Sequence, residues 1–176
     1  LFAALVIGAL VSQVLWVLLS GAIGKLWALI SGLSLYIALL IVIFTVLPAT
    51  SLAMMAGIFV LAGMTNGAYQ QIPWAIYPDL MDITRRASGE AIEGAFSAVW
   101  LFGQKVANAI APGLVGLILG VFGWQSSTGE VVAQTDAALG ALRIVMSLLP
   151  AAILALAILG LLTLYRRSLA RMREGA

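Results

Sequence analysis

The chain has 176 residues, of which 63% are hydrophobic and 9% charged, with a net charge of +2. Because a soluble domain carries roughly 25% charged residues, most of this surface must face an apolar medium, and a lipid bilayer is the obvious one. The chain has no cysteine and no histidine, which excludes disulfide frameworks, zinc chemistry and ordinary hydrolytic triads. The basic residues stand at expected membrane edges, which indicates topology and not nucleic-acid binding.

Long runs without charge predict transmembrane helices, because the strands of a membrane barrel are about 10 residues long and alternate in polarity. We expect an all-α integral membrane helix bundle with five spans, at about 1–20, 26–46, 51–77, 91–122 and 137–165. Pro48 should stop the second span and Pro78 the third, while Thr50 and Ser51 offer an N-cap for the third. Residues 166–176 form a basic tail.

Lysine and arginine predict the orientation of these spans. Lys25 follows the first span, Arg85 and Arg86 follow the third, and four arginines follow the fifth. The positive-inside rule therefore places the loop 78–90 and the C-terminus in the cytoplasm of a multi-pass cell-membrane protein. A hydrophobic helix is already under way at the first residue, so we expect a missing preceding helix. Six spans would be half of a twelve-helix transporter, and the other half would be a missing N-terminal one.

The third span carries a polar stripe, which consists of Thr65, Asn66, Tyr69, Gln70 and Gln71 and is followed by Trp74. Asn66 and Gln70 are one helical turn apart, as are Thr65 and Tyr69. Lipid-facing positions would not tolerate this polarity, so the stripe either lines a cavity or forms hydrogen bonds between packed helices. Tyr69 and Trp74 would suit stacking on a sugar ring or an apolar tail, although aromatic residues near a membrane edge are also common anchors.

The connection after the third span is the most densely charged segment, and it contains Asp79, Asp82, Arg85, Arg86, Glu90 and Glu93. Glu90 and Glu93 would favour the positive N-terminal end of the fourth span. The segment is either a solvated cytoplasmic loop or a gate. In a gate, Asp79 and Asp82 would pair with basic residues of the missing half, and breaking those pairs would open the cytoplasmic side.

Lys105 is the most informative charge in the chain. It lies about 12 residues into the fourth span, or about 18 Å along the helix, and therefore close to the bilayer midplane. A charge at that depth costs at least about 2.5–3.5 kcal/mol. Gln104 and Asn108, together with Ser97, make one side of this helix polar. Lys105 either binds an anionic or hydroxyl-rich solute, or couples to ion-binding carboxylates, or only snorkels or forms a fixed ion pair.

Glycines also line one side of the fourth span after Pro112. Gly113, Gly116 and Gly120 lie on this side, and the last two form a GxxxG motif. Such stripes allow helix backbones to approach closely. We therefore expect close helix packing at this seam.

Three segments resemble the glycoside–pentoside–hexuronide:cation symporter family, the melibiose permease-like group of the major facilitator superfamily. They are Pro73 to Asp82 (PWAIYPDLMD), Gly89 to Gly94 (GEAIEG) and Phe102 to Lys105 (FGQK). The resemblance implies that the spans are helices eight to twelve of a C-terminal half. It also implies that Lys105 lies near the cation and substrate cavity and that the two aspartates gate it. The family's loop arginine falls on Ala91 here, so Arg85 or Arg86 would have to replace it.

We therefore expect cation-coupled symport of a sugar, glycoside or related solute by alternating access, without enzymatic activity. The coupling cation would be sodium or a proton, and the resemblance implies that its main ligands lie in the missing half. No other cofactor is expected. The alternative is a non-transporting membrane scaffold or channel subunit. The residues expected to bind solute or couple to the cation are Lys105, Gln104, Asn108, Asn66, Tyr69, Gln70 and Trp74.

Overall fold

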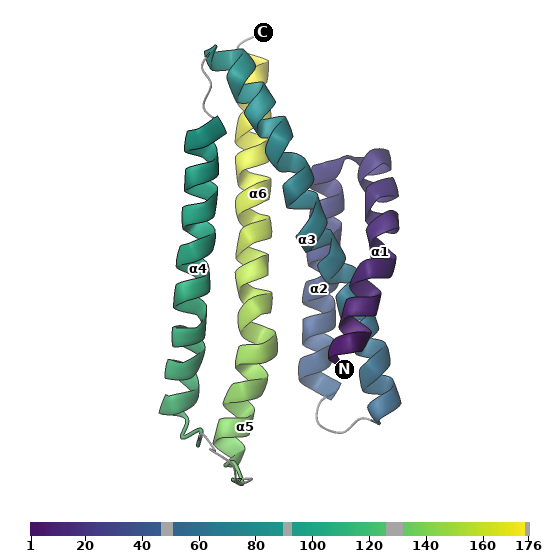
Figure 1. The fold of residues 1–176 in the computed structure, drawn as a ribbon, viewed down its shortest axis with the longest axis vertical. Coiled ribbons are helices and arrows are strands. Elements are labelled where there is room, and N and C mark those ends of the chain that lie inside the picture. The colour runs from purple at the N-terminus through teal and green to yellow at the C-terminus, as the bar shows by residue number, and fades with distance from the viewer. Residues whose placement is uncertain (47–50, 90–92, 126–131, 175–176) are drawn as a thin grey trace. The chain divides into compact units, whose positions relative to one another are not determined.

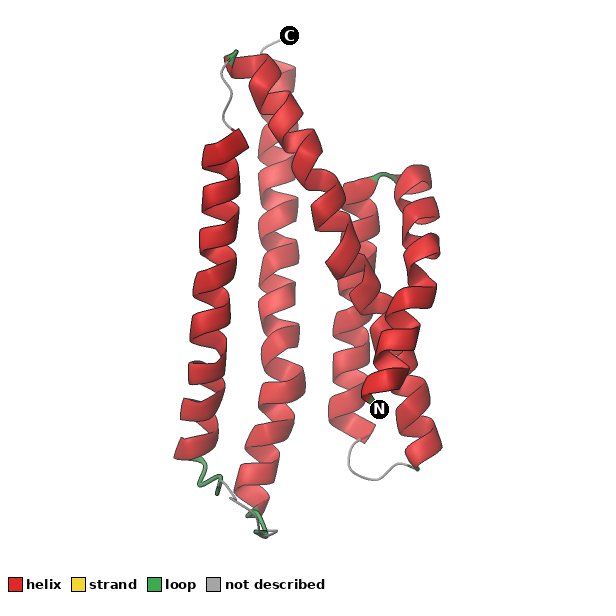
Figure 2. Cartoon of the chain, viewed as in Figure 1, coloured by secondary structure: helices red, strands yellow, loops and turns green. Residues whose placement is uncertain are grey.

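The computed structural model describes residues 1–46, 51–89, 93–125 and 132–174, and the regular structure in these ranges is helical (Figures 1 and 2). The elements are α1 (Phe2–Ile23), α2 (Lys25–Val46), α3 (Leu52–Ser88), α4 (Glu93–Val121), α5 (Asp136–Arg143), the π-helical turn η1 (Ile144–Leu148) and α6 (Leu149–Glu174). Five stretches among the described residues are long and apolar enough to cross a membrane. The predicted all-α membrane bundle with five spans is confirmed.

Most of the predicted helix boundaries are close to the observed ones. α1, α2 and α4 begin and end within about three residues of the predicted spans. The N-cap predicted for the third span is confirmed at Ser51, whose Oγ accepts a hydrogen bond from the backbone N–H of Met54 at 3.3 Å. The predicted roles of Pro48, Thr50, Glu90 and Ala91 lie outside the described residues.

The predicted end of the third span at Pro78 is wrong. α3 passes both Pro73 and Pro78 and continues to Ser88, so the charged segment that begins at Asp79 is helical through Arg86. A proline removes one helical hydrogen bond and normally bends or breaks a helix. Membrane helices tolerate proline because neighbouring helices, polar side chains or water can satisfy the freed carbonyl.

The predicted fifth span is not one regular helix, because the π-helical turn η1 separates α5 from α6. Pro150 supplies a physical reason, since it has no N–H to donate to the carbonyl of Met146 four residues earlier. A wider π-type turn accommodates such a break in the hydrogen-bond ladder. The backbone of α6 is helical to Glu174, so most of the predicted tail is a continuation of this helix.

The described chain divides into two compact units, which the sequence did not predict. One unit comprises Leu1–Pro73 and Ser147–Ala176, and the other comprises Trp74–Met146. The first unit therefore contains α1, α2, the first part of α3 and α6. The second contains the last part of α3, α4 and α5. In the first unit, α2 packs against both α1 and α6.

Glycines join α1 to α3 in the first unit. A Cβ atom added at Gly8 would collide with the backbone carbonyl of Val60, and one added at Gly63 would collide with that of Leu5. A Cβ atom added at Gly67, one turn after Gly63, would collide with the Oγ atom of Ser12 in α1. In lipid, where apolar burial gives little driving force, such close backbone approach is a main source of helix association.

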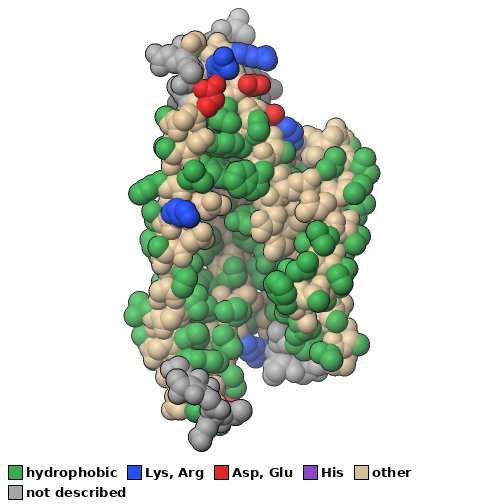
Figure 3. All heavy atoms as spheres, in the orientation of Figure 1, with side chains coloured by type: hydrophobic (Ala, Val, Ile, Leu, Met, Phe, Trp, Pro, Cys, Tyr) green, Lys and Arg blue, Asp and Glu red, His purple; other side chains and the backbone are tan. Residues whose placement is uncertain are grey.

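Many large apolar side chains of the described residues remain exposed. α4 buries none of its described residues within this chain. Hydrophobic side chains cover most of the helix flanks on the face drawn in Figure 3, and most of the acidic side chains visible there gather near the end of α3. This distribution suits helices whose flanks meet lipid or further transmembrane helices.

Candidate functional site

Four aromatic rings join the end of α3 to the start of α4 in the second unit. Tyr77 and Trp100 have ring centroids 5.3 Å apart, and Trp74 and Trp100 have theirs 5.7 Å apart. Phe96 lies 6.0 Å from Tyr77 by the same measure. These separations are typical of favourable tilted or edge-to-face ring pairs. The phenol of Tyr77 also donates a hydrogen bond to Ser97 Oγ at 2.7 Å. This aromatic cluster fixes the two helices to each other.

We predict that Tyr77→Phe destabilises the full-length protein by about 1 kcal/mol, because it removes one partly buried hydrogen bond and keeps the ring. Ser97→Ala removes the same bond from the other side. The double variant should therefore cost less than the sum of the two single changes. Thermal unfolding in detergent measures all three. Additive losses would contradict the contact between these two side chains.

Two of the predicted gating residues, Arg85 and Glu93, contact each other in the structure. Arg85 Nη1 donates to Glu93 Oε1 at 3.5 Å, with the two side chains 65% and 40% exposed. A pair this exposed contributes at most about 1 kcal/mol. Asp79, Asp82 and Arg86 are exposed on the last turns of α3. A weak pair can exchange partners readily, which suits a gate, but the gating role itself stays a prediction.

Lys105, Gln104 and Asn108 are all exposed on α4. Each residue turns an α-helix by about 100°, so Gln104 and Asn108 point within about 20° of the direction of Ser97, and Lys105 about 80° from it. Ser97 contacts Tyr77 of α3. The amides of Gln104 and Asn108 therefore continue the face of α4 that begins at the aromatic cluster, and Lys105 lies beside that face.

Three candidate site residues lie four positions before a proline within a helix: Tyr69 before Pro73, Trp74 before Pro78 and Asn108 before Pro112. Since proline has no N–H, the carbonyl of each residue lacks its usual helical donor. In transporters, carbonyls freed where a membrane helix is interrupted serve as ligands for the coupling cation. The proline spacing was visible in the sequence, but the continuous helix past Pro78 was needed to interpret it.

The polar stripe of α3 in the first unit begins with a packing residue. Thr65 is buried, and its hydroxyl donates to the carbonyls of Leu61 at 3.3 Å and Ala62 at 3.0 Å, in its own helix. A threonine that bonds back to the preceding turn needs no other partner. The hydroxyl of Thr65 is therefore satisfied within its own helix, and it has no free hydrogen atom to donate to a solute.

The remainder of the stripe is available for further contacts. Tyr69 is 51% exposed, and Gln70 is exposed as well. Asn66 and Gln71 each have a buried side-chain carbonyl oxygen that has no hydrogen-bond partner within the described chain. Because an unsatisfied buried acceptor costs about 1–3 kcal/mol, these two oxygens favour a donor from water, a solute or another helix.

The candidate binding residues fall in both units. The first unit holds Asn66, Tyr69 and Gln70, and the second holds Trp74, Gln104, Lys105 and Asn108. In the first unit all three residues lie on α3, whereas in the second unit Trp74 lies on α3 and the other three lie on α4. Their roles in binding a solute stay predictions.

Comparison with known proteins gives two kinds of match. A family model described as MFS/sugar transport protein matches residues 1–171. An uncharacterized symporter of Synechocystis sp. is 35% identical over 101 residues, which are 56% of this chain and 19% of that protein. The sodium-dependent lysophosphatidylcholine symporter 1-A of Danio rerio is 25% identical over 161 residues, which are 90% of this chain and 29% of that protein. The chain spans less than a third of either relative.

Proposed function

The chain belongs to the MFS/sugar transport protein family, and on that premise we propose that it forms part of a cation-coupled symporter of a sugar, glycoside or related solute. The solute would cross by alternating access, in which the transporter changes between an inward-facing and an outward-facing state. Transport of this kind requires no covalent chemistry, because differential binding in the two states and an ion gradient suffice. Both relatives are named as symporters, and the sodium dependence in the name of one of them supports coupling to a cation.

The polar surface of α4 is the observation that carries this proposal. An ammonium group and two amides occupy neighbouring positions in a membrane helix that buries no described residue within this chain. Lipid would penalise these groups by several kcal/mol, whereas a watery cavity or a hydroxylated solute would satisfy them. Lys105 would donate to hydroxyl or anionic oxygens of the solute. The amides of Gln104 and Asn108 would both donate and accept.

The first unit offers a second group of polar and aromatic residues that would suit contacts with a sugar-like solute. Asn66 offers a buried carbonyl oxygen without a partner in the described chain, and Tyr69 offers an exposed ring one turn away. Trp74 offers a further exposed ring. Aromatic rings bind the apolar faces of sugars, while amides bind their hydroxyl groups.

Coupling would connect the solute to sodium or a proton. The main ligands of the coupling cation would be carboxylates of the other half of the transporter, and Lys105 would compete with the cation for them. Occupation of the carboxylates by the cation would release the ammonium group to bind solute. Binding of the cation before the solute links solute affinity to the ion gradient, since the cation then raises the affinity for the solute and the solute raises the affinity for the cation.

We also propose that the α3–α4 connection and the C-terminal end of α6 face the cytoplasm of the cell membrane. Lysine and arginine concentrate beside these ends and beside the α1–α2 turn, as the positive-inside rule requires. The exposed Arg85–Glu93 pair would then lie at the cytoplasmic gate. Asp79 and Asp82 would face the same aqueous compartment.

The full-length protein in sealed vesicles provides the test. Uptake of radiolabelled glycosides, pentoses and hexuronides is measured with an inward sodium gradient, an inward proton gradient, or no gradient. At least one of these solutes should accumulate above its external concentration under one gradient, and an ionophore should abolish the accumulation. Gradient-independent equilibration of every solute would contradict coupling and favour a channel. Uptake of lysophosphatidylcholine is measured in the same vesicles, and its accumulation without accumulation of any of the sugar-like solutes would overturn the assignment of a sugar-like solute.

A further inference from the structure

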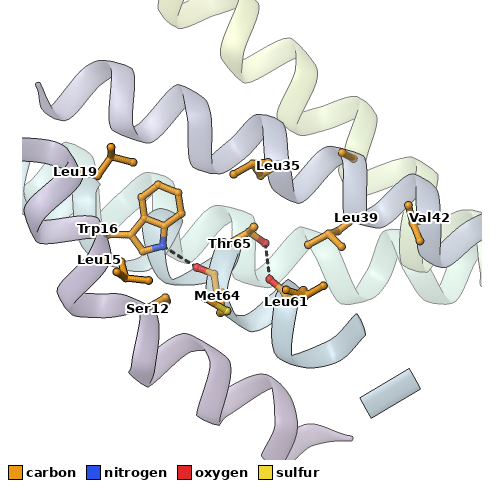
Figure 4. A pocket seen from close by; sticks show the side chains of 11 residues that line it. Ser12, Leu15, Trp16, Leu19, Leu35, Leu39, Val42, Leu61, Met64 and Thr65 are labelled. Carbon is orange, nitrogen blue, oxygen red and sulfur yellow. Dashed lines mark hydrogen bonds between the residues drawn. The ribbon is translucent and has the colours of Figure 1, made fainter. Parts of the chain in front are cut away.

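A hollow of about 550 Å³ lies among α1, α2 and α3 in the first unit (Figure 4). Leu15 of α1 and Leu35 of α2 are more than half exposed at its rim, while Trp16 is 7% exposed. Leu15 lies near the middle of α1, and Leu39, which also lines the hollow, lies near the middle of α2. The hollow therefore opens at mid-depth in the apolar spans, where hydrocarbon replaces water.

The polar groups around this hollow already have partners within the protein. The indole Nε1 of Trp16 donates to the carbonyl of Met64 at 2.7 Å, and the hydroxyl of Ser12 donates to the carbonyl of Ala9 at 3.0 Å. The hydroxyl of Thr65 donates to its own helix. No lysine, arginine, aspartate or glutamate is among the residues described as lining the hollow.

This chemistry distinguishes among ligand classes. A sugar would lose its bonds to water without gaining new ones, at a cost of several kcal/mol for its hydroxyl groups. A neutral alkyl chain has no hydrogen bonds to lose on entering such a site. The size favours an alkyl chain as well, because a whole helix with its side chains is about 10–12 Å wide and fits a hollow of about 550 Å³ between three helices less readily than a slim chain does. A single hydrocarbon chain can enter it.

We propose that this groove, lined by Leu15, Trp16, Leu35, Leu39, Met64 and Thr65, is an acyl-chain site that holds one hydrocarbon chain of a bilayer phospholipid. The headgroup would stay at the membrane surface, and the chain would fill a space that is costly to leave empty. The bound chain would brace α2 against the α1–α3 pair. The site is distinct from the polar surface proposed to bind solute, because the hydrogen-bonding groups of its lining already donate to backbone carbonyls of the protein.

Photolabelling of the full-length protein tests this proposal. Vesicles of phosphatidylcholine are doped with phosphatidylcholine that carries a diazirine at the middle of one acyl chain, and the labelled residues are mapped by mass spectrometry after irradiation. Residues that line the groove should be labelled severalfold more than Leu156, an exposed residue of α6 outside the groove. Ala38→Phe should lower the labelling severalfold, because Ala38 lines the groove and the new ring would fill it.

Ala157→Phe is the matched control, since Ala157 is exposed on α6 and does not line the groove. This variant should leave the labelling of the groove unchanged. If Ala38→Phe does not fold, Ala38→Leu gives a smaller filling of the same space. Labelling no stronger than that of Leu156, or equal labelling in all variants, would overturn the proposal. Uptake is measured separately, so failure of the lipid site and failure of the transport function are distinguishable.

Discussion

In the full-length protein, Gly63→Leu is expected to abolish the stable packing of α1 against α3. The new Cβ atom would meet the backbone carbonyl of Leu5, and the backbone of Ala9 lies beside it. A backbone cannot move aside as a flexible side chain can, so the helices must separate. Overpacking usually costs about 1–3 kcal/mol and occasionally more, and we expect a loss at the upper end of this range. The melting temperature in detergent should fall by several degrees, and the yield of monodisperse protein should fall with it.

Gly57→Leu is the matched control for this prediction. Gly57 lies in the same helix, and no described atom comes within 4 Å of the position of an added Cβ. Leucine is a better helix former than glycine by up to about 1 kcal/mol, so this variant should be neutral or slightly more stable. Gly8→Leu should behave like Gly63→Leu, because its Cβ would meet the carbonyl of Val60. Equal melting temperatures for the variants at positions 57 and 63 would contradict the close approach.

The glycines also show what the sequence leaves open. The GxxxG motif at Gly116 and Gly120 led to a prediction of close packing, yet no described residue lies within 4 Å of an added Cβ at either position. The motif at Gly63 and Gly67 carries the close contact instead. Both have the same spacing, and only the partner distinguishes them. A partner in another part of the chain cannot be deduced from local spacing.

The number and the approximate limits of the spans were predictable, because hydrophobic length is a local property that the thickness of the bilayer dictates. The helix past Pro78 and the π-helical turn before Pro150 were not. Proline removes one hydrogen bond wherever it stands, but whether the helix ends, bends or widens depends on neighbours that can satisfy the freed carbonyl. Those neighbours are distant in the sequence.

The candidate site was predictable in composition more than in arrangement. The free-energy cost of a charge near the bilayer midplane was enough to select Lys105 as a candidate binding residue. Helical spacing then placed Gln104 and Asn108 near it. The hydrogen bond between Tyr77 and Ser97 was not predicted, because it joins two helices through residues that are unremarkable in their own segments. The Arg85–Glu93 pair joins two residues of the predicted gating set, but their contact also depends on how the chain turns between the helices.

Lys105→Met in the full-length protein is expected to reduce gradient-driven solute uptake by roughly 10- to 150-fold. A charge-assisted hydrogen bond contributes about 1.5–3 kcal/mol, and each 1.4 kcal/mol corresponds to a factor of ten. Methionine keeps most of the length of the side chain and removes the ammonium group. Lys105→Arg restores the charge with a different shape, so it should retain part of the uptake. Transport in vesicles under the coupling gradient measures all three proteins.

The stability of the same variant separates the two roles considered for Lys105. If the ammonium group serves a solute or a coupling carboxylate, its removal relieves a cost of about 2.5–3.5 kcal/mol, and the variant should melt at the same temperature or higher. If Lys105 belongs to a fixed internal ion pair, its removal strands a buried carboxylate, which costs about 3–5 kcal/mol. Lost uptake together with unchanged or raised stability would support the transport role. Full uptake with lowered stability would reject it, because the lysine would then hold the fold together without acting on the solute.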